Sequence, residues 1–149
     1  EMVENEDDDI NSEHLLEQCD RIHEILNKEV KRYNGDYSKL FLLGYSQGAC
    51  LALDGGLSYS KKIGGIIGFK GHINMDIDDH LGVKQDIWVT HGKGDDTIGF
   101  EVAEEYYNKY IKMGYDITFF KQDKKVNHDA NSGIRQQIKN LEPWFIKKI

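Results

Sequence analysis

One stretch decides the fold of this chain: Leu40-Phe41-Leu42-Leu43-Gly44-Tyr45-Ser46-Gln47-Gly48. Four consecutive apolar residues predict a buried strand, which leads into a G-x-S-x-G pattern and then into a predicted helix. A serine on such a turn has a strained backbone and an exposed hydroxyl, so Ser46 is a candidate nucleophile. We expect glycine at 44 and 48 because side chains there would clash with the neighbouring strand and helix. The backbone N–H of Gln47 would supply one donor to a developing oxyanion. The alternative is an ordinary turn with a capping serine.

The composition is that of a single globular domain. A length of 149 residues is enough for a hydrophobic core, and no apolar run is long enough to span a membrane. The net charge of −7 and the lack of a basic patch with interleaved aromatics argue against a nucleic-acid surface. Cys19 and Cys50 fall on predicted helices, so we expect buried free thiols in a reducing, intracellular compartment. The chain opens at Glu1 within an acidic run, and we therefore expect one domain over residues 1–149 that is incomplete at its N-terminus.

Apolar periodicity predicts helices that alternate with short strands. In chain order we expect an acidic loop at 1–10, a helix capped by Asn11 or Ser12 and stopped by Asn34-Gly35, a strand at 40–43, a helix at 48–57, strands at 63–69 and 86–90, a helix at 101–113, a strand at 116–121, and a final helix from about Asn131. Gly55-Gly56 should end or loosen the second helix, and Pro143 should distort or interrupt the last one. This alternation predicts an α/β fold with a mostly parallel sheet and helices on both faces.

Three side chains with complementary chemistry follow three of these strands. Ser46, Asp95 and His128 each lie just beyond the carboxyl end of a strand, where ligands bind in such sheets. Their order along the chain is that of the α/β-hydrolase arrangement. The imidazole of His128 would accept the serine proton, and the carboxylate of Asp95 would orient and stabilise that imidazole.

Other residues compete for these roles. Asp96 is one step further along the acid loop, and spacing alone leaves it open as the acid. Asp129 adjoins the histidine in sequence, which usually directs its side chain elsewhere. His14 and His23 are predicted to be polar-face or boundary residues of the first helix without a ligand role. His72 and His80 are predicted to be solvated loop residues, although either could line a pocket. No spacing of histidine, cysteine or acidic residues indicates a metal site.

These motifs resemble the phospholipase/carboxylesterase family, which includes acyl-protein thioesterases and lysophospholipases. Leu42 to Ala49 is similar to the strand and nucleophile turn of that family, including the glutamine after serine. His91-Gly92-x-x-Asp95-x-x-Ile98 resembles its H-G-x-x-D-x-x-V acid loop, which selects Asp95 over Asp96, and His128 matches the base. The resemblance implies an α/β-hydrolase fold, hydrolysis of acyl esters or thioesters through an acyl-serine, and no cofactor.

The chain departs from the family pattern in several places. Gly99 stands where the family has proline, and Gly71 to Asn74 replaces a Leu-Pro step, so the acyl-chain preference is not predicted. The family places strands before the nucleophile strand, and an early loop supplies the second oxyanion donor. No strand signal precedes Lys39 here, which would leave the strand Leu40–Leu43 as an open, hydrophobic sheet edge.

Two hypotheses follow from this open edge. In the first, the chain is the C-terminal part of an active serine hydrolase, and an N-terminal segment of the same protein pairs with Leu40–Leu43. In the second, it is a weakly active or inactive hydrolase-like subunit that docks in an assembly, and another protein chain pairs with that strand.

Overall fold

The computed structural model describes residues 6–75 and 83–149. They form α1 (Glu6–Glu29), two 3₁₀ turns (Val30–Tyr33 and Tyr37–Lys39), β1 (Phe41–Tyr45), α2 (Gln47–Leu57), β2 (Gly65–Phe69), β3 (Ile87–Gly92), α3 (Phe100–Lys112), β4 (Ile117–Gln122) and α4 (Ile134–Ile146). This is the predicted alternation of helices and strands.

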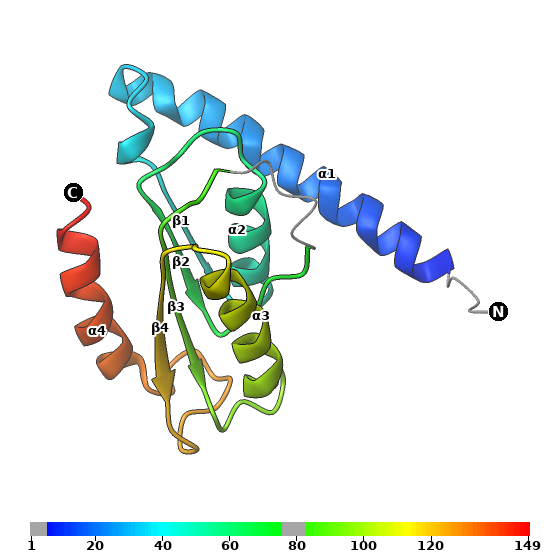
Figure 1. Cartoon of the computed structure of the whole chain (residues 1–149), viewed down its shortest axis with the longest axis vertical. Helices are drawn as coiled ribbons and strands as arrows, with labels where there is room; N and C mark the ends of the chain where they lie inside the picture. Colours follow the sequence, from blue (N-terminus) through cyan, green and yellow to red (C-terminus); the bar gives the residue numbers. More distant parts are fainter. Residues whose placement is uncertain (1–5, 76–82) are drawn as a thin grey trace.

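The strands form one parallel sheet in the order β1-β2-β3-β4. The register pairs Leu43 with Ile67, Gly68 with Val89, and Val89 with Phe119. All strands point to the same end of the molecule, and α4 covers one face while α1, α2 and α3 lie on the other (Figure 1). The expected mostly parallel sheet with helices on both faces is therefore confirmed.

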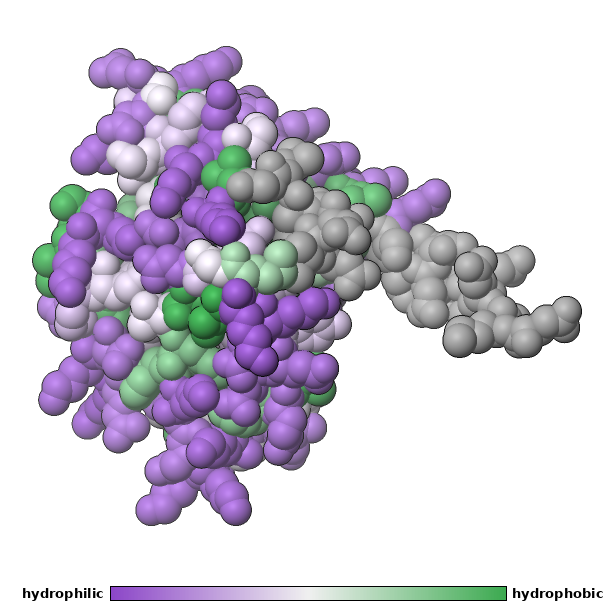
Figure 2. Space-filling model, in the orientation of Figure 1, coloured by the Kyte–Doolittle hydropathy of each residue, from purple (hydrophilic) through white to green (hydrophobic). Residues whose placement is uncertain are grey.

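Two hydrophobic clusters fill the space between these layers. Alternate residues of a strand point to opposite faces of the sheet, so Ile66 packs towards α2 and α3 while Ile67 packs towards α4. On the α4 side, Trp88 is fully buried and its indole Nε1–H donates to Asn140 Oδ1 at 3.0 Å. The surface in the same orientation is mostly hydrophilic, with hydrophobic side chains along the margin where α4 lies (Figure 2).

Gly55 and Gly56 allow α2 to lie close to its neighbours. The helix includes both and ends one residue later, at Leu57, so its end falls within a residue of the prediction. A Cβ on Gly56 would lie 2.3 Å from Ile66 Cδ1, and one on Gly55 would lie 3.0 Å from Ile22 Cγ2. These glycines therefore serve packing against the sheet and α1.

Two predictions of local structure were wrong. The first is the acidic loop at 1–10 followed by a helix capped by Asn11 or Ser12. α1 begins at Glu6, so both cap candidates lie inside the helix; residues 1–5 are outside the described part of the chain. Negative charge is favourable at a helix N-terminus, so an acidic run with few apolar residues does not specify a loop. The expected stop of the helical segment is confirmed, because Asn34 and Gly35 both have positive φ, at 54° and 82°.

The second is the predicted interruption of the last helix at Pro143, one of the two effects expected of this residue. α4 continues through this residue to Ile146. Proline removes one hydrogen bond of a helix interior. The following residues pack on the sheet: the Phe145 ring meets Phe41 edge-on at 4.9 Å, and Trp144 fills the space in which a Cβ on Gly65 would sit. We attribute the continuation of the helix to these aromatic contacts.

Candidate active site

Ser46 occupies a strained turn between β1 and α2. Its φ of 56° and ψ of −122° are unusual for a residue with a side chain, as predicted for this turn. The Ser46 N–H donates to Phe69 O at 2.8 Å, and the Ser46 carbonyl accepts from the N–H groups of Ala49 and Cys50. These bonds fix the turn to β2 on one side and to the first turn of α2 on the other.

The two glycines of the pattern differ in their surroundings. A Cβ on Gly44 would lie 2.1 Å from the Gly48 carbonyl oxygen and 2.5 Å from Ala49 N, so the predicted clash is present there. A Cβ on Gly48 would meet no described atom within 4 Å. The steric expectation for Gly48 is therefore wrong for the described chain, because the side of this residue that a Cβ would occupy is open.

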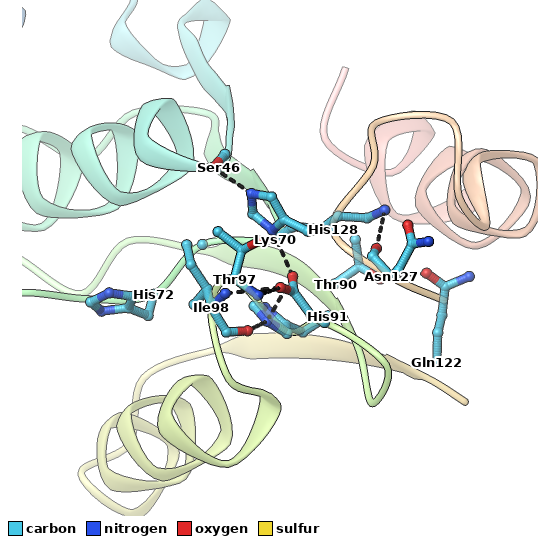
Figure 3. A network of polar contacts seen from close by, with 12 residues as sticks. Ser46, Lys70, His72, Thr90, His91, Thr97, Ile98, Gln122, Asn127 and His128 are labelled. Atoms are coloured by element: carbon cyan, nitrogen blue, oxygen red, sulfur yellow. Dashed lines mark hydrogen bonds and ion pairs between the residues drawn. The ribbon is translucent and has the colours of Figure 1, made fainter. Parts of the chain in front are cut away.

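The structure brings Ser46, His128 and Asp95 into a single chain of contacts. Figure 3 labels Ser46 and His128, with the dashed contact between them. Ser46 Oγ lies 2.7 Å from His128 Nε2, and His128 Nδ1 lies 2.8 Å from Asp95 Oδ2. A neutral imidazole with its proton on Nδ1 donates to the carboxylate and accepts from the serine hydroxyl, which satisfies both contacts. The Asp95 side chain is fully buried and that of His128 is 16% exposed, so the hydroxyl and imidazole face the surface while the carboxylate lies beneath them.

Several donors surround the carboxylate of Asp95. Its Oδ1 accepts from the backbone N–H groups of Thr97 at 3.0 Å and Ile98 at 2.9 Å. Burial raises the pKa of this carboxyl, but the hydrogen bonds from His128, Ile98 and Thr97 outweigh burial and hold the pKa below its ordinary value. Asp95 is therefore ionised at neutral pH.

Geometry also decides between the candidate acids. Asp95 is the carboxylate that contacts His128. Asp96 and Asp129 are both exposed, and neither side chain makes a hydrogen bond to His128 within the described residues. Of the candidates that spacing left open, Asp95 is thus the one whose contact favours it as the predicted acid.

Gln47 is the first residue of α2. The first N–H groups of a helix have no intrahelical acceptor and lie at its positive end, which suits them to bind an oxyanion. The backbone N–H of Gln47 remains our predicted donor for the developing oxyanion.

Three residues to which the sequence analysis assigned no individual role hold this arrangement in place. The Tyr45 hydroxyl donates to His128 O at 2.6 Å. Lys70, which is buried, donates to three carbonyl oxygens of the loop that carries His128. His91 Nε2 lies 2.7 Å from Ile98 O and 3.3 Å from Asp95 Oδ2. Burial lowers the pKa of His91, so its ring is neutral at neutral pH and donates from Nε2.

The other histidines and the cysteines take no part in these contacts. His23 Nε2 meets Gly55 O and Ser58 Oγ, His72 stacks on Tyr106, and exposed His14 lies near Glu17; the prediction for His80 lies outside the described residues. Cys19 and Cys50 are both buried and free, as predicted. Within residues 6–75 and 83–149 no cluster of histidine, cysteine and acidic residues could hold a metal ion, and the helices described there are too short or too polar to cross a membrane.

Comparison with known proteins assigns this chain to a family. The sequence profile described as Phospholipase/Carboxylesterase matches residues 2–144. The chain belongs to the phospholipase/carboxylesterase family. The resemblance carried by the Ser46 turn and the Asp95 loop is therefore confirmed over nearly the whole chain.

Within the phospholipase/carboxylesterase family, curated relatives match at low identity. Acyl-protein thioesterase 1 of Debaryomyces hansenii is 22% identical over 135 residues, covering 87% of this chain and 58% of that protein. Acyl-protein thioesterase 1 of Candida albicans is 25% identical over 139 residues, covering 85% and 60%. The chain thus spans about three fifths of the length of these relatives.

Solved structures confirm the α/β-hydrolase fold. Arabidopsis thaliana SOBER1 superposes with a TM-score of 0.80 at 23% identity, over 90% of this chain and 64% of that one. A Bacillus cereus carboxylesterase superposes with a TM-score of 0.72 at 17% identity, over 93% and 63%. At these identities the likeness establishes the fold alone.

Proposed function

We propose that this chain carries the catalytic residues of a serine hydrolase that cleaves acyl esters or thioesters. The single observation that supports this most directly is the pair of short contacts that links Ser46 Oγ to His128 Nε2 and His128 Nδ1 to Asp95 Oδ2. Serine is a weak nucleophile unless a base lies within hydrogen-bonding distance and is itself oriented by a third group. Family membership supports the same class of chemistry.

The proposed reaction proceeds in two halves. Ser46 Oγ attacks the acyl carbon while its proton passes to His128 Nε2, and the carbonyl electrons move to the oxygen to give a tetrahedral oxyanion. The oxyanion collapses, the bond to the leaving alcohol or thiol breaks, and the leaving group takes the proton from His128. Water then repeats the sequence on the acyl-serine, which releases the acid and restores the serine hydroxyl. In each half, Asp95 fixes the tautomer of the neutral imidazole and stabilises the imidazolium that forms from it.

The oxyanion requires donors that are already in place. In this proposal the backbone N–H of Gln47 supplies one of them, and a second would come from polypeptide outside the described residues. Loss of one such donor lowers kcat by about 10²- to 10³-fold in a well-studied serine protease. The proposal therefore predicts weak turnover for the 149 residues alone and stronger turnover for a polypeptide that adds the second donor.

The substrate class rests on the relatives. Two curated relatives are acyl-protein thioesterases, and one structural neighbour is a carboxylesterase. An ester or thioester carbonyl fits the proposed chemistry, since an alkoxide or thiolate leaving group can take its proton from His128.

Labelling with a fluorophosphonate tests this function. We expect covalent modification of the wild-type protein at Ser46 and no modification of Ser46→Ala. Ser60→Ala, which removes an exposed hydroxyl away from the turn, should be labelled as fast as wild type. Absence of labelling in the longest polypeptide that contains this chain would reject the proposal.

A second candidate function rests on the free edge of β1. Leu43 is 64% exposed and Tyr45 41%, and within the described residues β1 pairs on one side only, with β2. Beside this strand runs an apolar groove of about 300 Å³ lined by Leu43, Ile67, Ile138, Leu141, Glu142 and Phe145. An unprotected edge next to an apolar groove favours pairing with further polypeptide. The chain would then act as a docking subunit.

Affinity capture separates the two functions. If the chain is a docking subunit, it should recover a partner in stoichiometric amount, and Leu43→Lys should abolish recovery because a charge on an edge strand opposes pairing. Lys39→Met, outside the strand, is the matched control. Recovery that is equal for Leu43→Lys and wild type would reject docking through this edge.

A further inference from the structure

Three carbonyl oxygens of one loop converge on the ammonium group of Lys70. Its Nζ donates to Asn127 O at 2.7 Å, Asp129 O at 2.5 Å and Ser132 O at 2.9 Å. Lysine has three N–H donors only when it is protonated, so three accepting carbonyls require the charged form. Lys70 follows β2 directly, and its side chain reaches the main chain at Asn127 (Figure 3).

Both burial and backbone geometry make lysine an unfavourable residue at this position. Lys70 is 1% exposed, and lysine is almost never fully buried unless it is paired. Its φ of 58° lies in the left-handed region, which glycine adopts without steric cost and lysine does not. Its own N–H donates to Thr90 O at 3.0 Å, which fixes this backbone to β3. The three hydrogen bonds of the ammonium group compensate for these costs.

His128 lies between two of the carbonyls that Lys70 holds. Within the loop, Asn127 N donates to Ser132 Oγ and Asp129 N donates to Asn127 Oδ1. The Tyr45 hydroxyl also reaches the loop from β1, at His128 O, but Lys70 binds three of its carbonyls. The direction of the imidazole therefore depends on how the loop is fixed to the sheet. Without the ammonium group, Asn127 O would lose its donor, and Asp129 O and Ser132 O would keep only the Ser132 N–H and Gln137 Nε2 respectively, so the loop would be held less firmly to the end of β2.

We propose that Lys70 is a positioning residue for the base, one that orients the loop 127–132 so that the His128 ring reaches Ser46 and Asp95 together. This inference rests on the proposed hydrolase function for its kinetic consequence, although the orientation of the ring is a property of the protein without substrate. The residue acts through the loop and contacts neither the substrate nor the reacting atoms.

Two substitutions test the role. Lys70→Met keeps most of the length of the side chain and removes all three donors. Lys70→Gly suits the positive φ, so it guards against a failure to fold. Lys121→Met is the matched control, because it removes an exposed lysine that pairs with Glu104 away from the site.

We expect a loss of rate without a loss of binding. In both Lys70 variants the first-order rate of Ser46 labelling, and kcat for a p-nitrophenyl ester, should fall about 10- to 100-fold, because a displacement of about 1 Å can cost 10²-fold. KM should change less than about threefold, since the base contributes to the reaction step. Lys121→Met should match wild type. Wild-type kcat in a folded Lys70→Gly or Lys70→Met variant would overturn the inference, as would an effect confined to KM.

A readout without substrate separates this inference from the function itself. Proton NMR should show a downfield resonance for His128 Nδ1–H, bonded to Asp95, in wild type and Lys121→Met and not in the Lys70 variants. If wild type shows the resonance but is never labelled, the hydrolase proposal fails while Lys70 is still tested. An unchanged resonance in the Lys70 variants would reject the positioning role.

Discussion

The hydroxyl of Tyr45 donates a 2.6 Å hydrogen bond to the main-chain carbonyl of His128, which lies 83 residues further along the chain. The two rings also lie close, with their centroids 5.7 Å apart. Because Tyr45 immediately precedes Ser46, the turn that carries the proposed nucleophile also holds the proposed base. Lys70 holds the carbonyls on either side, so donors from β1 and from the residue after β2 fix three consecutive carbonyls of the base loop.

Tyr45→Phe should weaken this connection with little effect on the fold. It removes one partly exposed hydrogen bond, so we expect the free energy of unfolding to fall by about 0.5–1.5 kcal/mol and Ser46 labelling to slow by less than about tenfold. Urea unfolding and labelling rates measure the two effects. Tyr33→Phe, at another exposed tyrosine, should leave both unchanged. A loss as large as that predicted for Lys70→Met would contradict the secondary role given to Tyr45.

Asp95→Asn should impair the reaction far more than it disturbs the structure. An amide in place of the carboxylate favours the wrong tautomer of the imidazole, and the corresponding change in a serine protease lowers kcat by about 10⁴-fold. Asp96→Asn, at the exposed neighbour, should keep kcat within about twofold. Comparable losses in the two variants would show that the acid has been misassigned.

The same carboxylate should make stability depend on acidity. The pKa of Asp95 is below its ordinary value in the folded protein, so the folded state holds the ionised form more strongly than the unfolded chain does. Its contribution is fully present above the unfolded pKa of about 3.9 and is lost as pH falls through the lower folded pKa. Urea unfolding between about pH 5 and pH 2 should therefore show a shallower pH dependence in Asp95→Asn than in wild type or Asp96→Asn. Parallel curves for all three proteins would refute this assignment.

The two glycines of the turn should respond differently to alanine. Gly44→Ala would place a methyl group 2.1 Å from a backbone carbonyl. Backbone cannot yield as a side chain can, so we expect a loss of more than about 1–3 kcal/mol. Gly48→Ala has open space inside the first turn of α2, and alanine is the better helix former, so stability should change by less than about 1 kcal/mol. Thermal unfolding of the Gly44→Ala and Gly48→Ala variants measures the two changes in stability. Equal losses of stability would mean that Gly48 is also closely packed.

The sequence was sufficient to predict the features that depend on where the strands end. Parallel strands bring their carboxyl ends to one rim, so Ser46, Asp95 and His128 could be placed together from the strand pattern alone. It did not predict what depends on long-range packing. Lys70 follows an apolar strand and resembles the start of any polar loop, because its three acceptors lie 57 to 62 residues further along the chain.

Local rules also failed where tertiary contacts override them. The rule that proline breaks a helix does not hold at Pro143, where the aromatic residues that follow pack on the sheet. The clash expected at Gly48 was inferred from the motif, whereas the space around this residue in the described chain is open. An acidic composition suggested a loop where α1 already begins.

The free border of β1 and the base loop are mechanically linked through Tyr45. A polypeptide that paired with the free side of β1 would alter the twist or tilt of this strand. The Tyr45 phenol oxygen, at the end of β1, would carry that shift to the loop that holds His128. Assembly along the sheet would in this way adjust reactivity at its rim, with no ligand entering the site.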